Sequence, residues 1–385
     1  MSFFTRKAFF CKRARTNDPE PIGAGLIDRR LRVGLLASFF VANPALTVAD
    51  LYEFPAVQDE SADAKTITIF GSMDISSAQP LIEQYQRRNT QVGVAYHELD
   101  TLEIYSRYVD GIDRGERLAD ILLSPAMDLQ VKLANDGYVR QYQSPQTAAL
   151  PRWSQWRNEV FGFSFEPAVI VYNKNVLDAG QVPATRDELR AVLLDNADLF
   201  YGRVATYDIE RSGLGFLFLT QDAERSGEIW QLVSALGNSS VRLYTNTAAM
   251  LDLISNGRFV LGYNLLGSYA MRRAETDANL GVILPRDYTL VMIRTAVLPR
   301  DSREPELANE FLEFLLSNEG QSTVANSAGL YALHPDVPGE YTAGNLNNLV
   351  ANLVPIRIGP ALMVYLDRAK RQRILEDWQI ALSNQ

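Results

Sequence analysis

Two short polar segments precede predicted apolar helices and offer free backbone amides to a ligand. The tripeptide Arg211-Ser212-Gly213 stands before an apolar helical run, and Ser72 and Ser76 stand after the strand-like residues 66–70. The first N–H groups of a helix have no intrahelical acceptor, and the helix dipole favours negative charge beside them. Each segment therefore predicts an anion site. The alternative interpretation of each is an ordinary helix cap.

Residue types that carry most enzyme chemistry are scarce. The 385 residues contain one cysteine, Cys11, and two histidines, His97 and His334, with no Gly-x-Ser-x-Gly elbow, Walker loop or His-Glu-x-x-His motif. We therefore predict no enzymatic activity, no metal site and no cofactor. The formal net charge of −9 argues against nucleic acid or an anionic membrane as the main partner.

A secretory signal is predicted close to the N-terminus. Arg29, Arg30 and Arg32 precede the ten-residue apolar run 33–42, and Ala49 offers a cleavage site. The run is too short to span a bilayer, which takes ~20 residues. We predict a signal peptide over 29–49, preceded by a doubtful extension, 1–28, that a start codon placed too far upstream would explain. The alternative is a core helix or an uncleaved anchor. Cleavage would remove the cysteine, which suits an oxidising compartment.

The rest of the chain alternates between strand and helix patterns. Residues 50–65 are polar, lack periodicity and are predicted to be a linker. Strand-like runs at 66–70, 92–96 and 119–123 are each followed by a helical pattern. This order predicts an α/β fold with parallel sheets flanked by helices, in which ligands bind at the carboxyl ends of the strands.

Taken in order, several segments resemble the type 2 periplasmic solute-binding proteins of ABC importers, in the iron(III)-type branch. The segments are the opening strand and loop at 66–74, DILLSPAMD at 120–128, PAVIVYN at 167–173, GYN at 262–264 and ANEFLEFLLSNEGQ at 308–321. No single segment is specific; their order and spacing carry the resemblance. It covers nearly everything after Thr66.

The resemblance implies two lobes that close over a ligand about two hinge crossings, near 164–167 and 288–295. Lobe one would comprise 66–165 plus 290–345, lobe two 168–288, and a helical tail 346–385. The implied function is a periplasmic, monomeric binding protein that delivers a small solute to an inner-membrane ABC permease. A membrane sensor kinase is the alternative partner.

The resemblance also places the ligand in the loops that follow the strands. These loops are 71–77, 97–101 and 124–127 in lobe one, and 207–215 and 263–268 in lobe two. The predicted ligand-binding residues are Ser72, Met73, Ser76, Ser124, Tyr207, Arg211, Ser212, Gly213, Tyr263 and Asn264.

Two ligand classes follow from these residues. Iron-binding relatives place two adjacent tyrosines where this chain has Tyr263 and Asn264, and no adjacent pair of tyrosines exists here. His97 with Glu98, or Tyr207 with Asp208, would have to substitute, so ferric iron is the alternative prediction. The favoured ligand is a small organic anion, a phosphorylated or carboxylated metabolite held by helix N-termini and Arg211.

Overall fold

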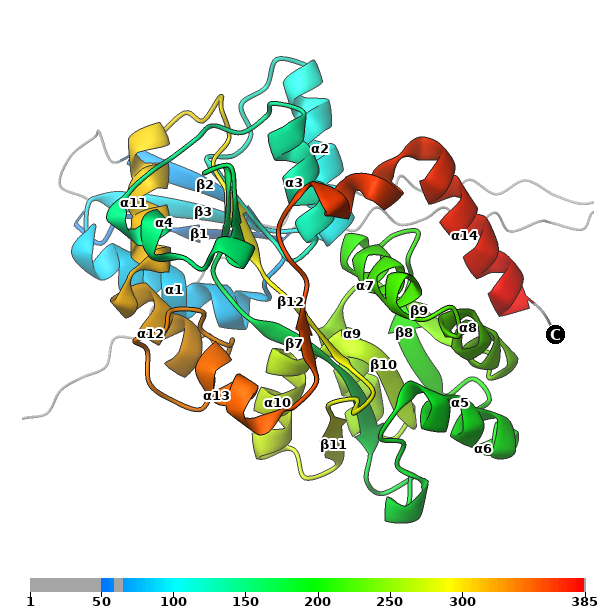
Figure 1. The fold of residues 1–385 in the computed structure, drawn as a ribbon. Coiled ribbons are helices and arrows are strands. Elements are labelled where there is room, and N and C mark those ends of the chain that lie inside the picture. The colour runs from blue at the N-terminus through cyan, green and yellow to red at the C-terminus, as the bar shows by residue number, and fades with distance from the viewer. Residues whose placement is uncertain (1–49, 59–64, 384–385) are drawn as a thin grey trace, which may run out of the picture.

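The computed structural model describes residues 50–58 and 65–383. The predicted signal peptide, 29–49, and the extension, 1–28, lie outside the described residues. Two seven-stranded sheets, each flanked by helices, form two halves of the molecule (Figure 1). We call the half built on the first sheet lobe one and the other half lobe two. The predicted two-lobed α/β fold is confirmed.

Lobe one is built on a sheet with the strand order β1-β3-β2-β4-β13-β6-β5. Its strands are β1 Asp50–Phe54, β2 Lys65–Gly71, β3 Val92–Glu98, β4 Ile121–Ser124, β5 Gln155–Trp156, β6 Val160–Gly162 and β13 Thr295–Val297. Because β2 pairs in parallel with both β3 and β4, the carboxyl ends of these three strands lie at one edge of the sheet.

Helices cover the sheet of lobe one because their apolar residues recur at helical spacing. They are α1 Ile75–Arg88, α2 Thr101–Asp113, α3 Met127–Asn135, α4 Pro145–Ala149, α11 Pro305–Leu316, α12 Asn318–Asn326 and α13 Ala343–Leu349. Tyr85 of α1 is fully buried, and its ring packs edge-on against Phe311 of α11 with the ring centroids 5.1 Å apart. Packing of this kind holds the helix N-termini at the edge where the strands end.

Lobe two is built on a sheet with the order β14-β12-β7-β10-β8-β9, and β11 pairs with β7. Its strands are β7 Glu166–Asn173, β8 Val204–Tyr207, β9 Arg242–Tyr244, β10 Leu261–Leu266, β11 Leu280–Ile283, β12 Thr289–Met292 and β14 Leu353–Pro355. Its helices are α5 Arg186–Asp195, α6 Ala197–Phe200, α7 Gly213–Arg225, α8 Ile229–Asn238, α9 Thr247–Ser255, α10 Gly267–Thr276 and α14 Arg368–Ser383.

The two halves meet along β7 and β12, which pair antiparallel between the lobes (Figure 1). The apolar run 290–298 reads as one strand in the sequence, but the structure divides it between two sheets. Residues up to Met292 belong to β12 in lobe two, and residues from Thr295 belong to β13 in lobe one. The interruption falls at Ile293 and Arg294 because the chain passes there from one sheet to the other. Arg294 is thereby held between the lobes.

Two segments differ from the sequence prediction. The predicted linker contains β1, which pairs antiparallel with β3 from Asp50 opposite Glu98 to Phe54 opposite Val94. An edge strand needs only one neighbour, so a short run without clear alternation can still pair. In the predicted helical tail, β14 pairs in parallel with β12.

The placement of the C-terminal helix follows from its apolar residues. Trp378 of α14 is only 4% exposed and completes the core of lobe two beside α8. Figure 1 shows α14, in red, lying alongside the helices of that lobe.

Candidate functional site

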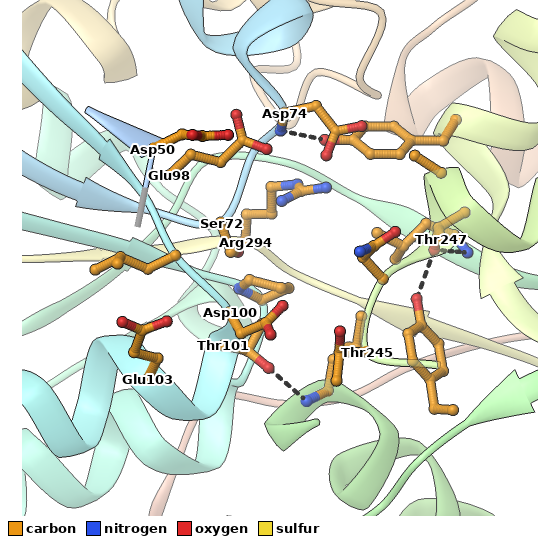
Figure 2. A pocket seen from close by; sticks show the side chains of 18 residues that line it. Asp50, Ser72, Asp74, Glu98, Asp100, Thr101, Glu103, Thr245, Thr247 and Arg294 are labelled. Atoms are coloured by element: carbon orange, nitrogen blue, oxygen red, sulfur yellow. Dashed lines mark hydrogen bonds between the residues drawn. The ribbon is translucent and has the colours of Figure 1, made fainter. Parts of the chain in front are cut away.

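A pocket of about 450 Å³ lies between the two lobes (Figure 2). Five carboxylates line it, all from lobe one: Asp50, Asp74, Glu98, Asp100 and Glu103. Lobe two contributes neutral polar side chains instead, namely Tyr207, Thr245, Asn246, Thr247 and Tyr269. Among the described residues that line this pocket, Arg294 is the one with a positive charge. The lining therefore has a marked excess of negative charge.

Strand ends and helix starts bring these residues together. Ser72 and Asp74 follow β2, and Glu98 is the last residue of β3. Asp100 is the residue before α2, and Pro125 follows β4. Since β2, β3 and β4 are parallel, their carboxyl ends meet at the same edge of the sheet. The β1 strand adds Asp50, which lies opposite Glu98 in the sheet.

The carboxylate of Glu98 lies at the N-terminus of α1. Its Oε2 atom accepts a hydrogen bond of 3.0 Å from the backbone N–H of Ile75. The pKa of Glu98 is raised to about 7, mainly by burial. The neighbouring carboxylate of Asp74 also raises this pKa, and its effect is larger than the lowering effect of the hydrogen bond from Ile75. Glu98 therefore changes charge near neutral pH.

The pKa values of Asp74 and Asp100 are shifted in the same direction. Burial is the main cause that raises the pKa of Asp74, and Arg294 opposes it. Burial likewise raises the pKa of Asp100, while a hydrogen bond from Thr245 and the charge of Arg211 lower it. Like charges gathered in a confined space disfavour one another's ionisation, and a bound positive charge would relieve this.

Arg294 is the buried, positively charged residue of the pocket lining. It is 1% exposed, and its Nε donates to Glu166 Oε1 at 2.6 Å. Glu166 also accepts hydrogen bonds from Ser164, at 2.8 Å, and from Ser268. Burial alone would lower the pKa of Arg294, but the charge of Glu166 keeps it raised. The Nη2 atom of Arg294 is buried without a hydrogen-bond partner.

Two hydrogen bonds join the lobes at residues that line the pocket. The backbone N–H of Leu214 in α7 donates to Thr101 Oγ1 of α2 at 3.3 Å, and the N–H of Asp74 donates to the Tyr269 hydroxyl at 3.2 Å (Figure 2). A Cβ atom added at Gly213 would lie 2.9 Å from Leu129 Cδ1 of lobe one. A methyl group at Gly213 would therefore force either the Leu129 side chain or the contact between the lobes to shift.

Among the ten residues predicted from sequence, the structure brings Ser72 and Tyr207 into the pocket lining. The Tyr207 hydroxyl shares a hydrogen bond of 2.5 Å with Thr247 Oγ1. Ser76 is exposed and lines a neighbouring hollow. Met73 is buried in the core of lobe one, and its backbone oxygen accepts from Tyr96.

The remaining predicted residues have other neighbours. Ser124 Oγ accepts from the backbone N–H of Ala126, and Ser212 Oγ accepts from that of Gly215, as a helix cap. Arg211 is exposed. The amide that follows Gly213 is already bonded to Thr101 of the opposite lobe.

Tyr263 and Asn264 lie inside lobe two. Both donate to the buried carboxylate of Asp222, Tyr263 at 2.9 Å and Asn264 at 2.8 Å. Arg186 donates to the Tyr263 hydroxyl at 2.8 Å. Neither side chain belongs to the pocket lining. His97 packs edge-on against Phe70, and over residues 50–58 and 65–383 no group of three or more His, Cys, Asp or Glu residues is placed to hold a metal ion.

The sequence reasoning missed most of the acidic lining and Arg294. The predicted loop 97–101 contains Glu98 and Asp100, and the clustering of acids at 98, 100 and 103 was a usable signal. Nothing local marks Arg294, because its position depends on the break between β12 and β13. In the part of the chain that the structure describes, no helix has the length and hydropathy needed to span a membrane.

The fold and the interlobe pocket together are those of a type 2 periplasmic binding protein. Residues 81–345 match the family of bacterial extracellular solute-binding proteins, and the chain belongs to that family. A substrate-binding protein of an ABC transporter from Agrobacterium tumefaciens is 44% identical and superposes with a TM-score of 0.84; the alignment covers 87% of this chain and 99% of that one. This protein is therefore a solute-binding protein of the ABC transporter type, as predicted.

More distant structures share the fold. AfuA from Actinobacillus pleuropneumoniae, with fructose-6-phosphate bound, is 16% identical, with a TM-score of 0.69 over 83% of this chain and 99% of that one. Iron-bound HitA from Pseudomonas aeruginosa is 17% identical, with a TM-score of 0.64 over 82% and 99%. Among proteins with curated descriptions, no match is found. Family and fold are thus settled, whereas the ligand has to be argued from the pocket.

Proposed function

We propose that this protein is the periplasmic solute-binding component of an ABC importer, and that its interlobe pocket binds a small solute carrying a positive charge. The observation that carries the proposal is the wall of five carboxylates facing a single guanidinium that Glu166 already neutralises. Charges of one sign in a cleft attract the opposite sign. The delivery partner is an inner-membrane permease; a sensor kinase partner stays a sequence prediction.

Two features weigh against the organic anion predicted from sequence. The first-turn amide of α1 is taken by the protein's own Glu98, and the Leu214 amide of α7 is taken by Thr101. An anion placed at either helix would meet the carboxylates that line the same pocket. The feature that favours an anionic group is the buried, unpartnered Nη2 of Arg294. Ferric iron rests on the resemblance alone, since Tyr263 contacts Asp222 and Arg186.

A thermal-shift screen sorted by ligand charge tests the proposal. The panel would contain choline and putrescine as cations, fructose-6-phosphate and citrate as anions, and ferric citrate. A ligand at 100 times its Kd stabilises by about 2.7 kcal/mol, which is a shift of several degrees. We expect shifts with positively charged compounds. A shift with the anions and none with the cations would restore the anion prediction.

A further inference from the structure

Two hydrogen-bond donors in the pocket are buried and have no acceptor within the protein. They are Nη2 of Arg294 and the hydroxyl of Ser72. Arg294 as a whole is 1% exposed, and its Nε is committed to Glu166. Native structures rarely leave buried donors unpaired, so an unpaired donor that lines a cavity points to an acceptor on the ligand.

The sheet register explains why both donors serve one cavity. Gly71 of β2 pairs with Leu123 of β4, and Thr295 of β13 pairs with Ser124 of β4. Ser72 and Arg294 therefore flank the carboxyl end of β4 from its two neighbouring strands. In Figure 2 both belong to the same side of the pocket, and Asp74 and Glu98 lie near the guanidinium. The pocket thus presents donors and carboxylates to one bound molecule.

We propose that the solute is a zwitterion, with a carboxylate bound by Arg294 Nη2 and Ser72 Oγ and a positively charged nitrogen beside Glu98, Asp74 and Asp100. This inference rests on the proposed function and adds the second charge. A guanidinium suits a carboxylate because its planar N–H groups match the two oxygens. The five lining carboxylates would repel the carboxylate of a simple anion. In a zwitterion, the positively charged nitrogen offsets this repulsion, so the carboxylate can reach Arg294. The 450 Å³ cavity has room for a small molecule that carries both groups.

Matched ligand triplets test the inference with the unmodified protein. Each triplet contains a zwitterion, the amine without its carboxylate and the acid without its nitrogen. We would use 4-aminobutanoate with propylamine and butanoate, glycine betaine with tetramethylammonium and acetate, and L-proline with pyrrolidine and cyclopentanecarboxylate. In calorimetry and thermal shift, we expect one zwitterion to bind about tenfold or more tightly than its amine, and its acid not to bind.

Each other outcome has a distinct meaning. Amines that bind as tightly as the zwitterions would overturn this inference and leave the proposed cation binding intact. Binding of the acids alone would overturn both. Binding of no compound in any triplet would overturn this inference, and the shifts with choline and putrescine would then decide whether the proposed cation binding holds.

One variant and one control test where the carboxylate of the ligand binds. Ser72→Ala is expected to weaken the selected zwitterion about fivefold while leaving its amine unchanged, because it removes a donor to the carboxylate only. Ser322→Ala, on helix α12 away from the pocket, is the control and should change neither. Equal weakening of both ligands by Ser72→Ala would contradict the assignment.

Discussion

The carboxylate of Glu98 accepts a hydrogen bond, 3.0 Å long, from the backbone amide of Ile75 in the first turn of helix α1. The positive end of this helix dipole is thus matched by a side chain of the protein itself. A helix N-terminus that would otherwise suit an anionic ligand instead holds a carboxylate at the edge of the pocket. This arrangement supports the proposed preference for positive charge over the anion that the sequence predicted.

Replacing Glu98 with glutamine should weaken binding of the cation that the thermal-shift panel selects. Glutamine retains an oxygen for the Ile75 amide but carries no charge, so the change isolates electrostatics. We expect a loss of about tenfold in affinity, measured by calorimetry at pH 8. The control is Glu83→Gln, which removes an exposed carboxylate on helix α1. Equal affinities for Glu98→Gln and the wild type would argue against the acidic wall as the binding surface.

The pKa of Glu98 predicts how unliganded stability depends on pH. Its value is raised from 4.5 to about 7 in the folded protein, so the folded state binds the proton more tightly than the unfolded chain. Glu98 therefore lowers stability progressively as pH rises from about 4.5 to about 7.

The measurement is the melting temperature of unliganded Glu98→Gln minus that of the wild type. We expect this difference to grow between pH 5 and pH 8, because glutamine has no charge to bury. A difference that stays constant, or shrinks, would show that Glu98 is not held in its raised-pKa state. Cation affinity of the wild type should rise with pH over the same range, because Glu98 becomes charged, and should fall as pH decreases below 7.

Substituting alanine for Gly213 should hinder lobe closure. The added Cβ would lie 2.9 Å from Leu129 Cδ1 and 3.2 Å from Ala126 Cβ, both in lobe one. Each lobe can still fold, so we expect a nearly unchanged melting temperature for the unliganded protein. Ligand affinity should fall about tenfold or more, and small-angle scattering should show a larger radius of gyration.

The matched control for this change is Gly344→Ala, where the added methyl meets only open space. It should leave affinity and radius of gyration unchanged. A Gly213→Ala protein that binds and scatters like the wild type would mean that the contact between α7 and lobe one yields at little cost.

Tyr263→Phe separates structural from ligand-binding roles. The Tyr263 hydroxyl donates to buried Asp222 and accepts from Arg186, so its removal leaves these groups with fewer partners. We expect the free energy of unfolding to fall by about 1–3 kcal/mol, which lowers the melting temperature by a few degrees. Affinity for the selected ligand should not change. Tyr201→Phe, at a residue that is 63% exposed, is the control. A loss of affinity without a loss of stability would instead support Tyr263 as a ligand contact.

The sequence by itself determined the architecture and the edge at which the pocket lies. Apolar periodicity is local, so the alternation of strands and helices from Thr66 predicted parallel sheets, and these put the loops at 71–77 and 97–101 at one edge. The same reasoning named Ser72 and Tyr207 as ligand-binding residues, and both line the pocket.

Only the tertiary structure decided the charge of the pocket. Asp50 reaches it through pairing of β1 with β3, and Arg294 meets Glu166 across 128 positions of sequence. Tyr263 turns instead toward Asp222 inside lobe two. Electrostatic preference depends on which charges are close in space and how deeply they are buried, and no local pattern encodes distances between residues so far apart in the chain.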